Sequence, residues 1–313
     1  MNKLLALGLL LLAPACTSTA ISPLALQHNH AGAELLSAGD LERAEANFRL
    51  ALEYAPGLPE ARMNLGVLAL RRGRPALAEE ELRAAIGLRE DFPEAFANLG
   101  AALEAQGRAS EAEQAYLSAL AIHPGLASAR RNLGRLLLAN GRHAEARAHL
   151  LRLLESDGSD REGHALLSWC ELLLGRPEAA AERLSYAFGE DPDGERTVPP
   201  VAYLVRAILE MREGALTDAL ADLTIAERAP TFRREVALRR AAIEVVLGDP
   251  TAAMARLGPL LEDDPFDAAA HLLMARASAD LGEPERAVEH AHAALELAPD
   301  LEAARVLLRE LGR

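Results

Sequence analysis

Large apolar residues recur along this chain every 34 residues, with a single step of 39. Two series carry the pattern, one made up of Leu65, Leu99, Leu133 and Leu167 and the other of Phe48, Leu82, Tyr116, Leu150, Leu184, Leu223 and Leu257. The two series predict the apolar stripes of two successive helices that bury each unit against the next. A period of this length is typical of a solenoid built from helix pairs.

Small residues keep the same register as the apolar ones. Eight glycines share one position: Gly39, Gly73, Gly107, Gly141, Gly175, Gly214, Gly248 and Gly282. An alanine follows each glycine by five residues, and Gly, Ala or Ser precedes each by seven. The two small positions let antiparallel helices approach closely. The glycine between them falls where the first helix ends, because glycine adopts the left-handed C-cap conformation without strain.

The segments "ARMNLGVLALRRGRPALAEEELRAAI" and "EAFANLGAALEAQGRASEAEQAYLSALAIHP" resemble the tetratricopeptide repeat family. This resemblance implies an all-α superhelical solenoid of eight helix-turn-helix repeats. We place the repeats at residues 25–58, 59–92, 93–126, 127–160, 161–194, 200–233, 234–267 and 268–301. Residues 302–313 then form a C-terminal capping helix with a charged outer face.

Two features depart from the repeat pattern. Arg206 and Arg240 occupy the position that leucine holds in repeats 2 to 5. Residues 195–199 form an insertion between repeats 5 and 6, in a stretch rich in proline and charge that predicts a loop. The loop is either a tolerated insertion or a hinge between the repeats at 25–194 and those at 200–301.

The net charge of −14 argues against binding to nucleic acid, since phosphate contacts require a positive surface. Lys3, the only lysine, begins an amino-terminal segment with the features of a secretory signal peptide over residues 1–15. Its apolar run, Leu4 to Leu12, is shorter than the roughly 20 residues that span a bilayer.

Cys16 follows Ala15 directly, and the segment therefore resembles a bacterial lipoprotein signal in which that cysteine is acylated. Residues 16–24 would then link the lipid to the first repeat. The resemblance implies attachment to the periplasmic face of the outer membrane, because Thr17, and not aspartate, follows the cysteine. The sequence Ala13-Pro14-Ala15 also fits ordinary signal cleavage, which would release a soluble periplasmic or secreted protein.

No catalytic or metal-binding motif is present in the sequence. His-Glu-x-x-His, a glycine-rich phosphate loop, a Ser-His-Asp set and a cysteine pair are all missing, and Cys170 is expected to be a small buried residue. We therefore expect no enzyme activity, no cofactor and no metal.

The first helices line the concave groove in this family, which makes their polar residues candidates for peptide binding. Asn64, Asn98 and Asn132 lie 34 residues apart on these helices. Such a ladder of amides could pair with the backbone of an extended peptide, although asparagine is also common at this repeat position. Arg131, Arg135 and Trp169 surround the ladder and are of the types enriched at binding hot spots. Trp169 could equally pack against the next helix.

Farther along, the expected groove positions become apolar. They are Leu166, Leu204, Val205, Leu238, Leu272 and Leu273. This set suggests either a hydrophobic half of the groove or tight closure of the superhelix.

In domain plan the chain looks like the tetratricopeptide lipoproteins called pilotins, which help an outer-membrane secretin of type IV pili to assemble. We expect a non-catalytic scaffold that binds a protein or peptide client and attaches to the membrane through its lipid. Two alternatives stay open: an adaptor for periplasmic proteases or cell-wall enzymes, and a self-associating structural element that forms a homo-oligomer.

Overall fold

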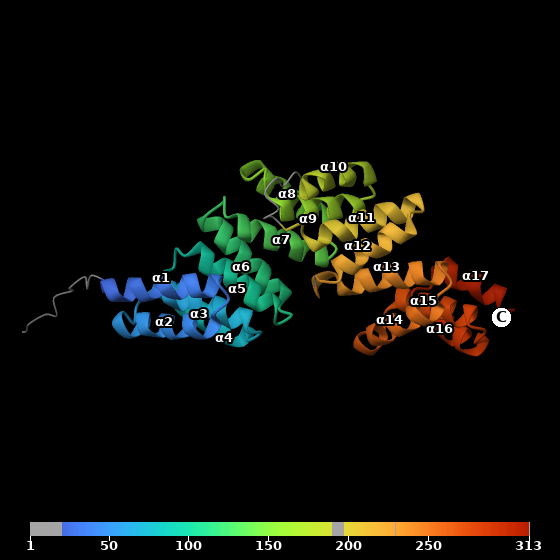
Figure 1. Ribbon diagram of the computed structural model, residues 1–313, viewed down its shortest axis with the longest axis horizontal. Coiled ribbons are helices and arrows are strands. Elements are labelled where there is room, and N and C mark those ends of the chain that lie inside the picture. The colour runs from blue at the N-terminus through green and yellow to red at the C-terminus, as the bar shows by residue number, and fades with distance from the viewer. Residues whose placement is uncertain (1–20, 190–196, 229, 313) are drawn as a thin grey trace, which may run out of the picture. The chain divides into compact units, whose positions relative to one another are not determined.

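The computed structural model describes residues 21–189, 197–228 and 230–312. Within these residues every regular element is a helix, which confirms the all-α prediction. The signal peptide, Cys16 and the first part of the 195–199 insertion lie outside the described residues. The chain divides into two compact units, residues 1–126 and 127–313, and each is described by itself (Figure 1).

Unit 1 contains three helix pairs. They are α1 (Pro23–Ser37) with α2 (Leu41–Tyr54), α3 (Pro59–Arg71) with α4 (Pro75–Leu88), and α5 (Pro93–Glu104) with α6 (Ala109–Ile122). The first helix of each pair packs against its own second helix, and among the first helices α1 contacts α3 and α3 contacts α5.

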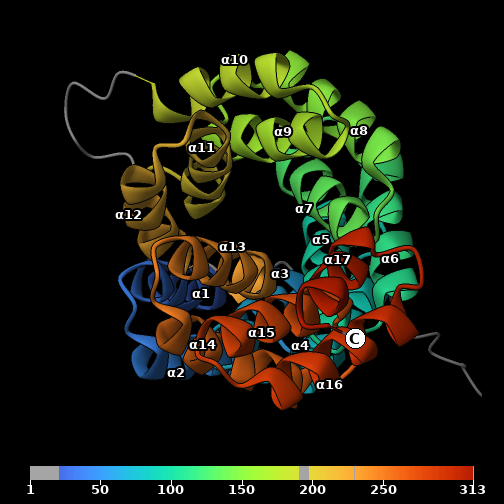
Figure 2. The same ribbon diagram turned by 90° about the vertical axis from the view of Figure 1, so that its right-hand side faces the viewer.

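Unit 2 continues the pairing and ends on a single helix. Its elements are α7 (Ala127–Ala139), α8 (His143–Ser156), α9 (Arg161–Leu173), α10 (Pro177–Phe188), α11 (Pro200–Glu213), α12 (Leu216–Ala226), η1 (Pro230–Phe232), α13 (Arg233–Val246), α14 (Pro250–Asp263), α15 (Ala268–Asp280), α16 (Pro284–Leu297) and α17 (Glu302–Glu310). Contacts join α7 to α9, α9 to α11 and α13 to α15. Figure 2 shows α8 and α10 on the outer side of α7 and α9, so the first helices form the inner, concave side of unit 2.

The repeat positions that hold Gly, Ala or Ser require a small residue because the two helices of a pair are in contact there. A Cβ atom added at Gly66 would lie 2.6 Å from Cγ of Leu82, and one at Gly100 would lie 2.5 Å from Cε1 of Tyr116. Every glycine that ends a first helix has a positive φ, such as 67° at Gly73 and 82° at Gly214. The repeat positions therefore have the structural roles that their chemistry predicts.

Repeats 6 and 7 accommodate arginine at the leucine position through ion pairs. Arg206 donates from Nε and Nη2 to the two carboxylate oxygens of buried Asp222, at 2.5 and 2.7 Å. Its guanidinium carbon also lies 4.1 Å from the ring centre of Phe188. Arg240 pairs with Glu227 at 2.7 Å. A carboxylate from a neighbouring element thus replaces the apolar contact that leucine makes elsewhere.

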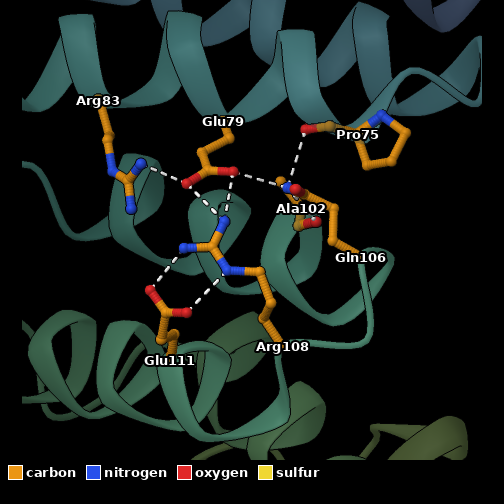
Figure 3. Close-up of polar contacts among 7 residues, drawn as sticks. All are labelled: Pro75, Glu79, Arg83, Ala102, Gln106, Arg108 and Glu111. Atoms are coloured by element: carbon orange, nitrogen blue, oxygen red, sulfur yellow. Dashed lines mark hydrogen bonds and ion pairs between the residues drawn. The ribbon is translucent and has the colours of Figure 1, made fainter.

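A second polar contact joins repeat 2 to repeat 3 (Figure 3). Glu79 of α4 is 8% exposed and accepts hydrogen bonds from Gln106 at 2.8 Å and from Arg108 at 2.7 and 2.8 Å. Arg83 also pairs with this carboxylate. These hydrogen bonds, first from Gln106 and then from Arg108, hold the pKa of Glu79 below its usual value. Glu45 stands one repeat earlier and pairs with Arg72 in the same way.

Replacement of Glu79 by alanine should lower the free energy of unfolding by about 1–3 kcal/mol, because Arg108 and Gln106 lose a buried acceptor. Urea titration measures the change, and Glu80→Ala, an exposed carboxylate beside it, is the matched control. Since the folded pKa of Glu79 is depressed, its contribution is complete above the unfolded value of about 4.3 and is lost as the pH falls through the folded value. Equal stabilities of the two variants at pH 7 would contradict this role.

Candidate functional site

A hollow in unit 2 lies between α13 and α15. This α13–α15 cavity has a volume of about 700 Å³, and most of its lining surface is apolar. Leu238 and Ala242 come from α13, and Leu272 and Leu273 come from α15. Phe266, in the turn before α15, also lines the cavity and is 77% exposed. An apolar hollow of this size that carries a few polar groups is the usual form of a binding site.

Arginines and carboxylates in fixed pairs surround the α13–α15 cavity. Arg234 donates from Nε and Nη2 to the two oxygens of Asp267 at 2.6 and 2.8 Å. Asp267 is 3% exposed and also accepts from the backbone N–H groups of Ala269 and Ala270 at the start of α15. Burial opposes ionisation of Asp267, but these hydrogen bonds outweigh it and hold its pKa below the ordinary value. The adjacent pair, Arg239 with Glu235, is 2.7 Å apart.

A second, smaller hollow of about 300 Å³ adjoins the first. Arg135 of α7, Trp169 of α9 and Phe232 of η1 line it. Arg234 and Glu235 line both hollows, so the two are neighbours, and together we call them the inner groove of unit 2. The inner groove follows the first helices α7, α9, α13 and α15, the side that the repeat pattern assigns to ligand binding.

The three asparagines of the predicted ladder lie on first helices and are half-buried. Asn64 donates from Nδ2 to Oδ1 of Asn29 on α1 at 2.9 Å, so one of its amide hydrogens is already used. Within the residues that the structure describes, the side chains of Asn98 and Asn132 make no hydrogen bond. Asn64 and Asn98 belong to unit 1 and Asn132 to unit 2, so the structure does not place the three as one row. The ladder stays a prediction.

Arg131 is held in an internal ion pair. Its Nη2 lies 2.5 Å from Oδ2 of Asp160, which is 7% exposed and accepts from the backbone N–H of Gly163 at the start of α9. Arg234 and Asp267 form the same arrangement three repeats later. Arg131 therefore links α7 to α9. Only those N–H groups of its guanidinium that do not bind Asp160 are available to donate to a client.

Trp169 is 8% exposed and meets Phe232 edge to face, with ring centres 6.3 Å apart. The indole forms part of the groove wall and does not project into it. Arg135 lies in the same section of the groove.

The expected apolar half of the groove divides in two. Leu166, Leu204 and Val205 are at most 1% exposed and belong to the core, so their assignment to the groove surface is wrong. Leu238, Leu272 and Leu273 line the α13–α15 cavity.

Two groove phenylalanines were not among the residues singled out from the sequence. Phe232 and Phe266 are 34 residues apart, at a repeat position that Gly57, Asp91 and Gly125 occupy earlier in the chain. A large aromatic residue at a turn position is the signal that could have identified both.

Cys170 is fully buried, and its thiol donates to the backbone oxygen of His143 at 3.1 Å. Burial raises the pKa of this thiol to about 11, which makes it unreactive near neutral pH. In the described part of the chain, no group of three or more His, Cys, Asp or Glu side chains is arranged to hold a metal ion. Across those same residues, no helix is long and apolar enough to cross a membrane.

Sequence models of the tetratricopeptide repeat family match residues 31–91, 69–127 and 238–302, and a further model of that family matches residues 103–170. Together these matches span more than half of the chain. The chain belongs to the tetratricopeptide repeat family. Its fold is a scaffold suited to protein–protein interaction and is typically non-catalytic.

Solved structures show the same fold. A tetratricopeptide repeat protein from Parabacteroides merdae is 21% identical, with coverage of 82% of this chain and 99% of that one and a TM-score of 0.53. The pilF protein of Pseudomonas aeruginosa is 22% identical, with coverage of 65% and 90% and a TM-score of 0.55.

One chain in the crystal structure of the APC/C hetero-tetramer Cut9–Hcn1 is 16% identical to this chain, with coverage of 87% of this chain and a TM-score of 0.64. This chain spans about half (52%) of the matched chain. At these identities the likeness concerns the fold alone. A search of curated proteins finds no match.

The fluorescence of Trp169, the only tryptophan in the chain, should report its packing. Because the indole is 8% exposed, its emission should be blue-shifted relative to free tryptophan and weakly quenched by acrylamide. Phe232→Ala should shift the emission to the red and increase quenching, whereas Phe266→Ala, 34 residues away, should change neither. A wild-type spectrum typical of solvated indole would show that Trp169 projects into the groove.

Proposed function

We propose that this protein is a non-catalytic scaffold, anchored by a lipid at Cys16 to the periplasmic face of the outer membrane, that binds a polypeptide client in the inner groove of unit 2. Membership of the tetratricopeptide repeat family supports the scaffold role. The sequence around Cys16 supports the anchor.

The α13–α15 cavity is the observation that carries the proposal. Its volume of about 700 Å³ is within the range of pockets that enclose most of a small ligand, and is enough for apolar side chains of a client. Leu272 and Leu273 provide the apolar contact. The side chains of Arg234 and Arg239 are 55% and 42% exposed in their ion pairs, so each can still donate to a client carbonyl or carboxylate.

The client class that we propose is a subunit of an outer-membrane assembly such as a type IV pilus secretin. The predicted anchor would keep the groove next to such an assembly. The alternative clients are a periplasmic protease or cell-wall enzyme, and a second copy of this chain. Identification of the captured protein would distinguish these clients from a secretin subunit. In this proposal Asn132 contacts the client backbone, Arg135 borders it, and Arg131 contributes the N–H groups left over from its ion pair. Asn64 and Asn98 belong to unit 1 and stay a separate prediction of peptide contact.

A photo-crosslinking amino acid placed at Ala242, inside the α13–α15 cavity, should capture the client in living cells. The same amino acid at Glu296, an exposed position on α16, is the matched control. We expect the yield of crosslinked product to be at least tenfold lower from position 296 than from position 242. Mass spectrometry of the product from position 242 then identifies the captured client.

Leu273→Glu, which places a charge among the apolar residues of the cavity, should suppress the crosslink at position 242 while the far-ultraviolet circular dichroism stays unchanged. Equal crosslinking at positions 242 and 296, or a crosslink that survives Leu273→Glu, would exclude the α13–α15 cavity as the binding site.

Replacement of Cys16 by serine should abolish lipid attachment, because the serine hydroxyl does not replace the thiol in acylation. The variant should accumulate unprocessed or appear in the soluble periplasmic fraction, as judged by membrane flotation and by the mass of the amino-terminal peptide. Retention of a processed variant in the membrane fraction would show that the anchor is not at this cysteine.

A further inference from the structure

The amino-terminal turn of α1 exposes three large aliphatic side chains. Ile21, Leu24 and Leu26 are 49%, 47% and 49% exposed, and we call this group the α1 tip. At 100° per residue, Leu24 and Leu26 lie on opposite sides of the buried Ala25, so the whole first turn is apolar and not just one face. Exposed aliphatic residues gathered in this way usually mark a surface that something else covers.

Comparison with the other repeats shows that the α1 tip is unusual. Leu24 occupies the repeat position of Leu58 and Phe92, which are 1% and 4% exposed because each packs against the preceding repeat. Among the residues that the structure describes, no repeat packs on Leu24 from the amino-terminal side of α1. Leu26 occupies the position of Glu60, Glu94 and Glu162, of which Glu94 and Glu162 are exposed. Repeat 6 also has an aliphatic residue at this position, Val201, but Val201 is 3% exposed whereas Leu26 is 49% exposed.

The charge pattern of the same region points to the kind of partner. No Asp, Glu, Lys or Arg occurs between Lys3 and Glu34, although such residues make up 26% of the chain. The first turn of α1 carries no acidic residue, as in α7, α11 and α15, whereas α3, α5, α9 and α13 each carry a glutamate there. A carboxylate in this position would favour its helix through the helix dipole and would oppose contact with a membrane.

The opposite end of the solenoid is protected differently. The helix α17 buries Ala304, Leu307 and Leu308 against α15 and α16, and it exposes charged residues such as Glu302 and Arg309. Solenoids need a polar outer face on their terminal repeats to stay soluble. The carboxyl-terminal end has such a face, and the α1 tip does not.

We propose that the α1 tip inserts into the headgroup region of the phospholipid bilayer to which Cys16 is anchored. This inference rests on the lipid anchor of the proposed function. Four residues lie between Cys16 and Ile21, and the five fully extended steps from Cys16 to Ile21 reach at most about 18 Å. The anchor therefore holds the α1 tip beside the bilayer, and the tip supplies the second apolar contact that makes attachment by lipid more stable.

Quenching of tryptophan fluorescence by brominated lipid tests this contact directly. The chain from residue 16, which keeps all described residues, is coupled through Cys16 to a maleimide lipid in phosphatidylcholine vesicles, and Cys170 is too buried to compete. Leu26→Trp places the probe on the α1 tip. The matched control is Glu94→Trp, which has the same repeat position two repeats later.

Brominated acyl chains should quench the added fluorescence of Leu26→Trp at least threefold more strongly than that of Glu94→Trp, after subtraction of the wild-type signal from Trp169. Leu24→Trp should behave like Leu26→Trp. Equal quenching at positions 26 and 94 in the coupled protein would overturn the proposal. So would an emission shift of Leu26→Trp that depends on protein concentration without vesicles, because a second copy would then cover the tip.

The coupling chemistry separates this result from the proposed function. Attachment through the maleimide lipid does not depend on acylation in the cell. A failure of the α1 tip to contact lipid therefore leaves the Cys16→Ser experiment unaffected, and the absence of natural acylation leaves the quenching result valid.

Discussion

Close contact between the two helices of each repeat is the constraint on which the rest of the structure depends. At Gly66 and Gly100 the partner side chains come so near that a Cβ atom would lie 2.6 Å from Leu82 or 2.5 Å from Tyr116. Such contact fixes the crossing of the two helices, and stacking of repeats with the same crossing places every first helix on the same side. The inner groove of unit 2 lies along four of these first helices, α7, α9, α13 and α15.

Contacts between repeats are less uniform, and polar pairs provide many of them. Leu58 and Phe92 fill the last position of their repeats with apolar side chains. Asp160 and Asp267 occupy the same position in later repeats, where each caps the following helix and binds an arginine on the first helix of its own repeat, Arg131 on α7 or Arg234 on α13. One carboxylate thus replaces an apolar contact by satisfying helix N–H groups and a guanidinium together. The arginines near the groove therefore stabilise the contact between repeats, and only the N–H groups that the carboxylates do not use are available to a ligand.

The periodic part of this molecule could be predicted from sequence because each repeat position has one physical requirement. Glycine at Gly73 permits a positive φ, and the small residue at Gly66 permits helix contact, whatever surrounds the repeat. The exposure of residues in the candidate site, by contrast, depends on the helices around each repeat and not on the repeat position alone. Leu204 and Leu272 share one repeat position, yet Leu204 is fully buried and Leu272 lines a cavity, because the neighbouring first helices pack differently around them. Periodicity identifies the inner side of the solenoid but not the depth of each residue on it.

The same limit explains Arg131 and Trp169. Each has the chemistry of a binding hot spot, but a side chain capable of strong contacts with a client is equally capable of strong contacts within the protein. Arg131 pairs with Asp160, and Trp169 packs against Phe232. Residues that break the repeat pattern without a structural partner are better indicators of function. Phe266 at a turn position and Leu26 at a glutamate position both replace a residue suited to solvent with a large apolar one, and 77% and 49% of their surfaces stay exposed. Exposure of that kind lowers solubility without improving the packing of the repeat. The contacts that we propose, with a client at Phe266 and with a bilayer at Leu26, would account for both exposed side chains.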